Sequence, residues 1–132
     1  MSIGLLIITH NHIGDALLLT ATRMLEKCPL QTKTLEVTNQ SNPDELRQQA
    51  LELMHQLDQG DGVLVLTDMY GSTPSNIAAT LLSQGQVHVV AGINLPMLVR
   101  VLNYPNLDLN DLTIKAVSGG NDGIVHCIPG QS

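Results

Sequence analysis

The sequence predicts an α/β fold, a three-layer sandwich in which helices cover both faces of a mostly parallel central sheet. Two apolar runs, residues 3–9 and 63–66, lack the alternation of a half-exposed strand, which is typical of parallel strands buried on both faces. Between such runs the hydrophobic period becomes that of an amphipathic helix, so strands and helices alternate along the chain. The length of 132 residues indicates one domain, covering residues 1–132.

The first half of the chain contains two predicted strands and two predicted helices. The helix after the first strand has an apolar face made of Ile13, Leu17, Ala21, Met24 and Cys28. Pro29 is expected to end this helix, and residues 32–38 alternate as a strand does. The second helix begins with Asn42 as its cap, Pro43 in the first position and Glu45 closing a capping box. Its apolar stripe consists of Leu46, Ala50, Leu53 and Leu57.

The second half of the chain contains further predicted elements. They are a buried strand at 63–66, a helix from Thr73 to about Ser83, a strand at 87–91, a short helix from Leu95 and a helix over 108–117. Gly119 and Gly120 are expected to stop the last helix, because glycine is unfavourable inside helices. Residues 123–128 are expected to form a closing strand.

Composition and charge exclude several classes of function. Hydrophobic residues make up 43% of the chain and the mean hydropathy is +0.13, which fits a soluble protein; Trp and Phe are absent, so the core is expected to be aliphatic. A net charge of −6 with scattered Lys and Arg argues against nucleic acid or an anionic membrane and favours a basic protein partner. No segment approaches the roughly 20 apolar residues of a membrane span. The N-terminus lacks a signal-peptide pattern.

The cysteines and most histidines are expected to be structural residues. Cys28 and Cys127 match no metal or redox spacing, and we expect both to be reduced and buried, as in a cytoplasmic protein. His55 is expected at the surface, and His88 and His126 within strands. The methionines expected to fill the core are Met24, Met54 and Met97.

Side chains that can take part in chemical reactions lie where the predicted strands end. Right-handed crossovers bring the carboxyl ends of parallel strands to one edge of the sheet, where ligands bind. His10 follows the first strand, and Asp68 follows the strand at 63–66. If these strands are neighbours, the carboxylate can bind one ring nitrogen of His10, fix the tautomer and leave the other nitrogen as an oriented nucleophile.

A segment of small polar residues follows Asp68. Gly71 allows close approach of the backbone, and Thr73 with Pro74 begins a helix whose free N–H groups attract an anion. The hydroxyl groups that can add donors are those of Ser72, Thr73 and Ser75. Neither motif contains Lys or Arg, so this cradle consists of neutral donors, and an arginine that assists transfer would come from a partner. A histidine facing such a cradle can hold a phosphoryl group on nitrogen.

Three segments of the chain carry a family resemblance. They are Ile8-Thr9-His10, residues 66–76 (LTDMYGSTPSN) and residues 91–98 (AGINLPML). Together, in order and spacing, they resemble the IIA domain of the mannose family of the phosphoenolpyruvate-dependent sugar phosphotransferase system. The resemblance covers essentially the whole chain.

This resemblance implies a phosphotransferase component that accepts a phosphoryl group from the phosphohistidine carrier protein HPr. In that family the phosphate sits on Nε2 of the residue matching His10, and the residue matching Asp68 holds the opposite ring nitrogen. The loop around the phosphoryl oxygens matches Gly71, Ser72, Thr73, Ser75 and Asn76. The group then passes to a IIB component or serves as a regulatory signal. The family is also typically a homodimer in which the C-terminal strand, here residues 123–128, adds to the partner's sheet. We expect a cytoplasmic protein that needs no cofactor.

The residues leave other classes of function open. The phosphoryl-donor subunit of dihydroxyacetone kinase resembles this fold but differs around the loop. A regulatory module can use the cradle to sense an anion or nucleotide without covalent chemistry. A metal-dependent hydrolase would use His10, His12 and Asp68, but the helix beginning at Ile13 ends the strand periodicity too soon, so no metal is expected. The sequence names neither the sugar nor a IIB partner.

Overall fold

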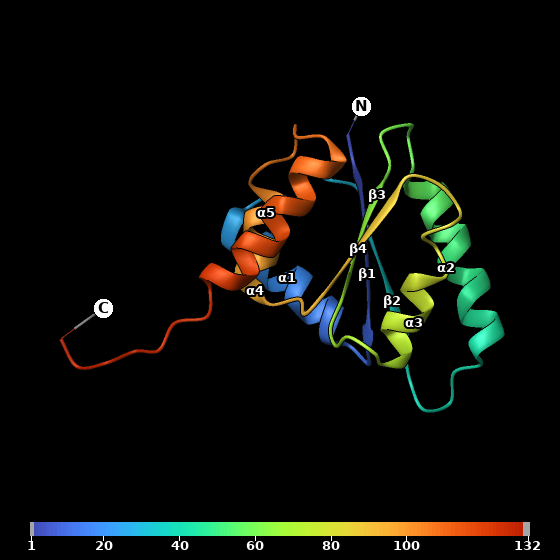
Figure 1. The fold of residues 1–132 in the computed structure, drawn as a ribbon, viewed down its shortest axis with the longest axis horizontal. Coiled ribbons are helices and arrows are strands. Elements are labelled where there is room, and N and C mark those ends of the chain that lie inside the picture. The colour runs from blue at the N-terminus through green and yellow to red at the C-terminus, as the bar shows by residue number, and fades with distance from the viewer. Residues whose placement is uncertain (1, 131–132) are drawn as a thin grey trace.

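The computed structural model describes residues 2–130 and contains a four-stranded parallel sheet with helices on both faces (Figure 1). Its strands are β1 (Gly4–His10), β2 (Thr32–Val37), β3 (Val63–Thr67) and β4 (Val87–Ala91), in the order β2-β1-β3-β4. All the neighbouring strands pair in parallel. The predicted α/β class and parallel sheet are confirmed.

The helices cover both faces of the sheet and form a separate hydrophobic core on each face. They are α1 (Ile13–Leu25), α2 (Pro43–Leu57), α3 (Thr73–Ala79), α4 (Leu95–Leu102) and α5 (Leu109–Asp122). Helices α1, α4 and α5 cover one face of the sheet, and α2 and α3 cover the other (Figure 1). Leu5 and Ile7 of β1 point into the first core, and Leu6 and Ile8 point into the second. Both faces of β1 are therefore buried, which explains its unbroken apolar run.

Helix α2 begins at the predicted cap, but within residues 2–130 the Glu45 side chain forms no capping-box hydrogen bond with Asn42. Oδ1 of Asn42 accepts the N–H groups of Asp44 and Glu45 at 2.9 and 3.2 Å, and Pro43 occupies the first helical position. Helix α3 is shorter than predicted and ends at Ala79 instead of Ser83, because the N–H groups that follow bond three residues back and form turns.

The end and the buried face of α1 differ from the prediction. Glu26 has a left-handed backbone with φ of 58° and ends the helix, so Pro29 is not its terminator. The fully buried positions of α1 are Gly14 and Ala21. Ile13 and Met24, which were assigned to the core face, are 45% and 60% exposed. The other two methionines that were expected to fill the core, Met54 and Met97, are buried.

Helix α5 runs through the two glycines that were expected to stop it. A Cβ atom on Gly119 would lie 2.8 Å from Cβ of Arg100, and one on Gly120 would lie 2.8 Å from Cε of Met97. Both partners belong to α4. The glycines therefore let α5 approach α4 closely, and the packing outweighs their low helix propensity.

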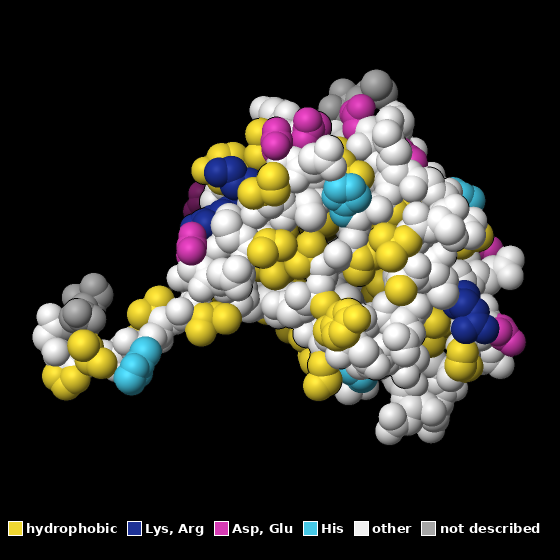
Figure 2. All heavy atoms as spheres, viewed as in Figure 1, with side chains coloured by type: hydrophobic (Ala, Val, Ile, Leu, Met, Phe, Trp, Pro, Cys, Tyr) yellow, Lys and Arg dark blue, Asp and Glu magenta, His cyan; other side chains and the backbone are white. Residues whose placement is uncertain are grey.

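The chain beyond α5 leaves the body of the molecule as an extended tail (Figure 1). In the described part of this segment, residues 123–130, the predicted closing strand is absent from the single chain. Apolar side chains gather along the protruding tail (Figure 2), and Ile124 and Val125 are 76% and 69% exposed. His126 also lies in this tail and not in a strand.

The cysteines are free but not buried. Cys28 follows the end of α1 and Cys127 lies in the tail, and both are exposed. The prediction of buried thiols was wrong, because it assumed that α1 and a closing strand cover these positions. Over residues 2–130, no helix combines the length and the apolar character needed to cross a membrane.

Candidate functional site

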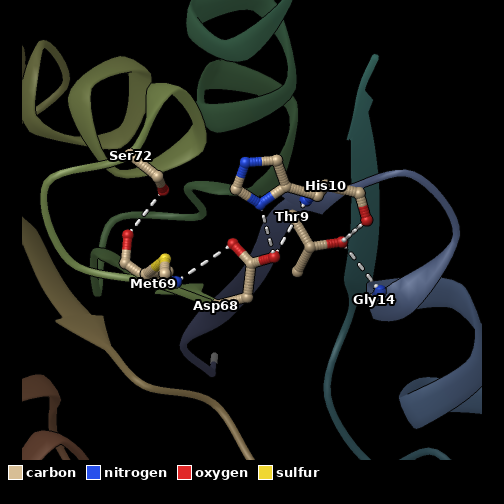
Figure 3. Close-up of polar contacts among 6 residues, drawn as sticks. All are labelled: Thr9, His10, Gly14, Asp68, Met69 and Ser72. Carbon is tan, nitrogen blue, oxygen red and sulfur yellow. Dashed lines mark hydrogen bonds and ion pairs between the residues drawn. The ribbon is translucent and has the colours of Figure 1, made fainter. Parts of the chain in front are cut away.

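The ends of β1 and β3 bring His10 and Asp68 together. The two strands are neighbours, with Ile8 opposite Thr67. Nδ1 of His10 lies 2.8 Å from Oδ2 of Asp68, and the backbone N–H of His10 donates to the same oxygen at 3.1 Å (Figure 3). Two hydrogen bonds from one residue thus fix the carboxylate against the imidazole.

The second carboxylate oxygen of Asp68 is also held. Oδ1 accepts the N–H of Met69 at 3.1 Å (Figure 3). Burial alone would raise the pKa of Asp68, but the hydrogen bonds from His10 and its charge outweigh burial and hold this pKa below its ordinary value. The Asp68 side chain is 12% exposed and the His10 side chain 41% exposed. The pair therefore combines a fixed, ionised carboxylate with an accessible ring.

The contact with Asp68 determines which nitrogen of His10 is free. A carboxylate only accepts hydrogen bonds, so in the neutral ring Nδ1 carries the proton and Nε2 keeps its lone pair. Nε2 points away from Asp68 (Figure 3). Within residues 2–130, no group forms a hydrogen bond with Nε2. The imidazole is therefore held in one orientation, with the lone pair of Nε2 unoccupied and accessible.

Thr9 is a positioning residue that the sequence reasoning missed. Its Oγ1 accepts the N–H of Gly14 at 2.8 Å and donates to the carbonyl of His10 at 3.2 Å (Figure 3). The hydroxyl ties the first turn of α1 to the end of β1 and fixes the backbone that carries His10. The available sequence signal was a threonine at the end of the apolar run, directly before His10, because threonine hydroxyl groups often bond to nearby backbone.

The loop after Asp68 differs in detail from the predicted cradle of hydroxyl donors. Gly71 has φ of +84° and open space around its Cα. Oγ of Ser72 donates to the carbonyl of Met69 at 2.5 Å, so that proton is already used inside the loop (Figure 3). Ser75 is buried, whereas Thr73 and Asn76 are exposed. Pro74 has no N–H and the N–H of Asn76 bonds to Ser72, so the N–H groups of Thr73 and Ser75 are the better donors in the first turn of α3.

The third motif joins the strand ends to α4 and α5. Oδ1 of Asn94 caps α4 by accepting the N–H of Met97 at 2.9 Å, and its Nδ2 donates to the carbonyl of Gly120 at 3.1 Å. The N–H groups of Gly92 and Ile93 donate to the carbonyl of Thr67. This motif braces the backbone next to Asp68.

The structure does not assemble the metal set His10, His12 and Asp68. Nδ1 of His12 lies 3.2 Å from Oε2 of Glu36 on β2, whereas Asp68 follows β3 on the other side of β1. Asn11, with φ of 48°, reverses the backbone between the two histidines. The alternation of side chains along a strand, which would place His10 and His12 on one face, therefore ends at Asn11.

Three cationic side chains of the described residues have partners away from His10. Arg47 pairs with Asp44, Arg100 pairs with Asp122 at 2.8 Å, and Lys115 lies over the ring of Tyr104. Over residues 2–130, Asp68 has His10 as its ion-pair partner and no Lys or Arg. The pair of His10 and Asp68 is therefore not neutralised by a guanidinium or ammonium group of the described residues.

A cavity of about 610 Å³ lies elsewhere in the fold. It is lined by residues 60–61, 85–88 and 106–110, at the edge of the sheet opposite His10. Its lining contains none of the residues predicted from the sequence to act on phosphate. We therefore place the candidate site at the accessible imidazole of His10 and not in this cavity.

Comparisons with known proteins agree on one family. Residues 4–115 match the family model described as "PTS system fructose IIA component", where PTS is the phosphotransferase system. The chain is 30% identical over 127 residues to the PTS system mannose-specific EIIAB component of Escherichia coli K12, covering 94% of this chain and 39% of that protein. It therefore spans well under half the length of that curated relative.

Two further matches extend the comparison. A stretch of 60 residues is 43% identical to the PTS system fructose-specific EIIA component of Bacillus subtilis, covering 42% of this chain and 41% of that protein. The mannose/sorbose specific IIA subunit of the phosphotransferase system from Enterococcus faecalis superposes with a TM-score of 0.86 over 100% of both chains. Its sequence identity is 21%, so this match shows the shared fold.

Proposed function

Since the chain belongs to the mannose-type IIA family of the sugar phosphotransferase system, we propose that it carries a phosphoryl group on Nε2 of His10. Family membership supports phosphoryl transfer in a sugar phosphotransferase system and favours neither a dihydroxyacetone kinase subunit nor a non-catalytic anion sensor. The observation that carries the assignment to His10 is the 2.8 Å contact between its Nδ1 and Asp68, which leaves Nε2 free.

The proposed step is an in-line displacement at phosphorus. The lone pair of Nε2 attacks the phosphorus of a phosphohistidine on the donor protein. The new P–N bond to His10 forms as the P–N bond to the donor histidine breaks, and the donor nitrogen recovers the electron pair. The proton on Nδ1 stays in place, so the His10 ring becomes positively charged. Asp68 stabilises that charge, and transfer onward reverses the same steps.

We assign the phosphoryl oxygens to the loop that follows Asp68. Gly71 leaves room for them, and the free N–H groups at the start of α3 supply neutral donors. The hydroxyl groups of Ser72, Thr73 and Ser75 and the amide of Asn76 complete the proposed cradle. Ser72 contributes its proton only after its hydroxyl rotates away from the carbonyl of Met69.

A basic carrier protein of the HPr type is the proposed donor. The net charge of −6 favours approach of such a protein, which would also supply the cations that His10 lacks nearby. Met69 and Tyr70 follow Asp68 directly and are 60% and 88% exposed, so they offer apolar contact area beside the imidazole. A IIB component or a regulated protein is the proposed acceptor.

The tail supports a proposed homodimer with exchanged strands. After Gly123, the C-cap of α5, residues 124–128 are extended and exposed, and Ile124, Val125 and Ile128 are 76%, 69% and 44% exposed. Strand β4 forms an edge of the sheet, with its outer hydrogen-bonding groups open to another strand. We propose that residues 1–132 form one IIA domain whose tail adds to the sheet of a second copy.

Phosphorylation in a defined mixture tests the function. The chain is incubated with phosphoenolpyruvate, enzyme I and HPr, and its intact mass is measured. We expect one added phosphoryl group that is acid-labile and base-stable. His10→Ala should remove it, and His55→Ala, which changes an exposed histidine on α2, should keep it. A label that persists in His10→Ala contradicts the assignment to His10.

A further inference from the structure

A second cluster of ionisable side chains lies beside β1, on the side away from Asp68. It consists of His12 from the connection between β1 and α1, Asp15 from the first turn of α1 and Glu36 from β2. One ligand atom from each residue lies within 4.8 Å of the others. We propose that these three side chains bind a divalent transition-metal ion of the zinc class.

The distances between donor atoms suit one metal ion. Nδ1 of His12 lies 3.2 Å from Oε2 of Glu36 and 3.6 Å from Oδ2 of Asp15. Two ligands held at about 2.1 Å from zinc at the tetrahedral angle are roughly 3.4 Å apart. Both carboxylates face the same ring nitrogen, so an ion can sit between the three atoms after small adjustments of the side chains.

The backbone and a neighbouring hydroxyl orient the carboxylates. Asp15 lies three residues after His12, which is the spacing that places side chains on one side of a helical turn. Thr34 and Glu36 share one side of β2, since side chains alternate along a strand. Oγ1 of Thr34 donates to Oδ1 of Asp15 at 2.5 Å, which leaves Oδ2 facing His12. Such a hydrogen bond to the outer oxygen of a ligand is typical of metal sites.

The charges of the cluster match a dication. Two carboxylates approach one another in a protein of net charge −6, and over residues 2–130 neither pairs with Lys or Arg. A divalent cation neutralises both. One imidazole and two carboxylates with water in the open position form a ligand set that zinc accepts. The His12 side chain is 78% exposed, so that water position faces solvent.

The proposed metal site is separate from His10. Glu36 lies on β2 and Asp68 follows β3, on opposite sides of β1. Metal binding therefore uses none of the atoms that hold the imidazole of His10. The inference rests on the position of the three ligands and stands or falls independently of the phosphoryl-transfer function.

Metal titration of the full, untagged chain tests the inference. The exposed thiols of Cys28 and Cys127 also bind zinc, so the parent carries Cys28→Ser and Cys127→Ser. Zinc binding is measured by calorimetry, and cobalt binding by the visible absorption of a tetrahedral ion. We expect one ion per chain. His12→Ala and Glu36→Gln should each weaken binding more than about tenfold.

Matched variants separate this site from other histidines and carboxylates. His55→Ala and Glu52→Gln change exposed groups on α2 and should leave the affinity unchanged. His126→Ala and His10→Ala should also keep the ion. The proposal is overturned if the parent binds no stoichiometric ion, which would make the cluster an ion pair of protonated His12 only. It is equally overturned if His12→Ala binds as tightly as the parent, or if His10→Ala loses the ion.

Discussion

Asp68 holds His10 by its ring and by its backbone, although 58 residues separate the two along the chain. Oδ2 of Asp68 accepts both Nδ1–H at 2.8 Å and the peptide N–H at 3.1 Å. The side chain therefore fixes the tautomer and also fixes the end of β1. Replacement of the carboxylate should therefore change both the rate of phosphorylation and the free energy of unfolding, and each effect can be measured by itself.

Asp68→Asn should slow phosphorylation of His10 while the fold stays intact. The amide can still occupy the position, but it carries no charge to stabilise the imidazolium, and it can present an N–H to Nδ1 and favour the wrong tautomer. We expect a loss of roughly 10- to 100-fold in the single-turnover rate with phosphorylated HPr. Rapid-quench kinetics measures it, and Asp61→Asn, at the opposite edge of the sheet, serves as the control. A variant as fast as the parent excludes the orienting role of Asp68.

The stability of the protein should show a specific acid dependence that comes from Asp68. Its pKa is lower in the folded protein than in the unfolded chain, so ionised Asp68 stabilises the fold above the unfolded pKa of about 3.9. That contribution is lost as the pH falls below about 4 and through the folded pKa. Urea unfolding from pH 7 to pH 3 should show that the difference between parent and Asp68→Asn shrinks in acid. A difference that is constant over this range contradicts the prediction.

Gly119→Ala should destabilise the protein although alanine is the better helix former. Propensity favours alanine by about 1 kcal/mol, but the new Cβ would lie 2.8 Å from Cβ of Arg100 and force α4 and α5 apart. Overpacking of this kind costs about 1–3 kcal/mol, so we expect a net loss of about 1 kcal/mol in the free energy of unfolding. Gly85→Ala, whose Cβ would meet only Cε of Met54 at 3.9 Å, should change it by less than about 0.5 kcal/mol. Urea denaturation of both variants checks the contrast; a stabilised Gly119→Ala would show that α5 can shift freely.

The parts of the fold that depend on local signals could be predicted from the sequence. The unbroken apolar runs give β1 and β3, and the cap at Asn42 gives the start of α2. Once these strands are recognised as parallel, their carboxyl ends share an edge, and the contact between His10 and Asp68 follows from strand order. The position of the pair of His10 and Asp68 was therefore predictable from hydrophobic periodicity and the rules for strand connections.

Features decided by packing between distant elements could not be predicted in the same way. Glycine in a helix is unfavourable by itself, and only the approach of α4 explains why α5 continues through Gly119. The apolar stripe of α1 was placed too near Ile13 and Met24, because the face that is buried depends on how α1 packs against α4 and the sheet. The contact between His12 and Glu36 depends on the register of β2 against β1, which periodicity does not give.

Removal of residues 124–132 should convert the proposed homodimer into a folded monomer. The described part of this tail is exposed and contacts the body little, so α5 and the sheet should remain intact without it. Loss of the apolar tail removes the strand that would pair with β4 of a second copy, so the mass measured by light scattering after gel filtration should halve. Ile114→Ser, which removes an exposed apolar side chain from α5, is the control and should leave the mass unchanged. A parent chain that is already monomeric, or a truncated chain that still forms dimers, contradicts strand exchange through this tail.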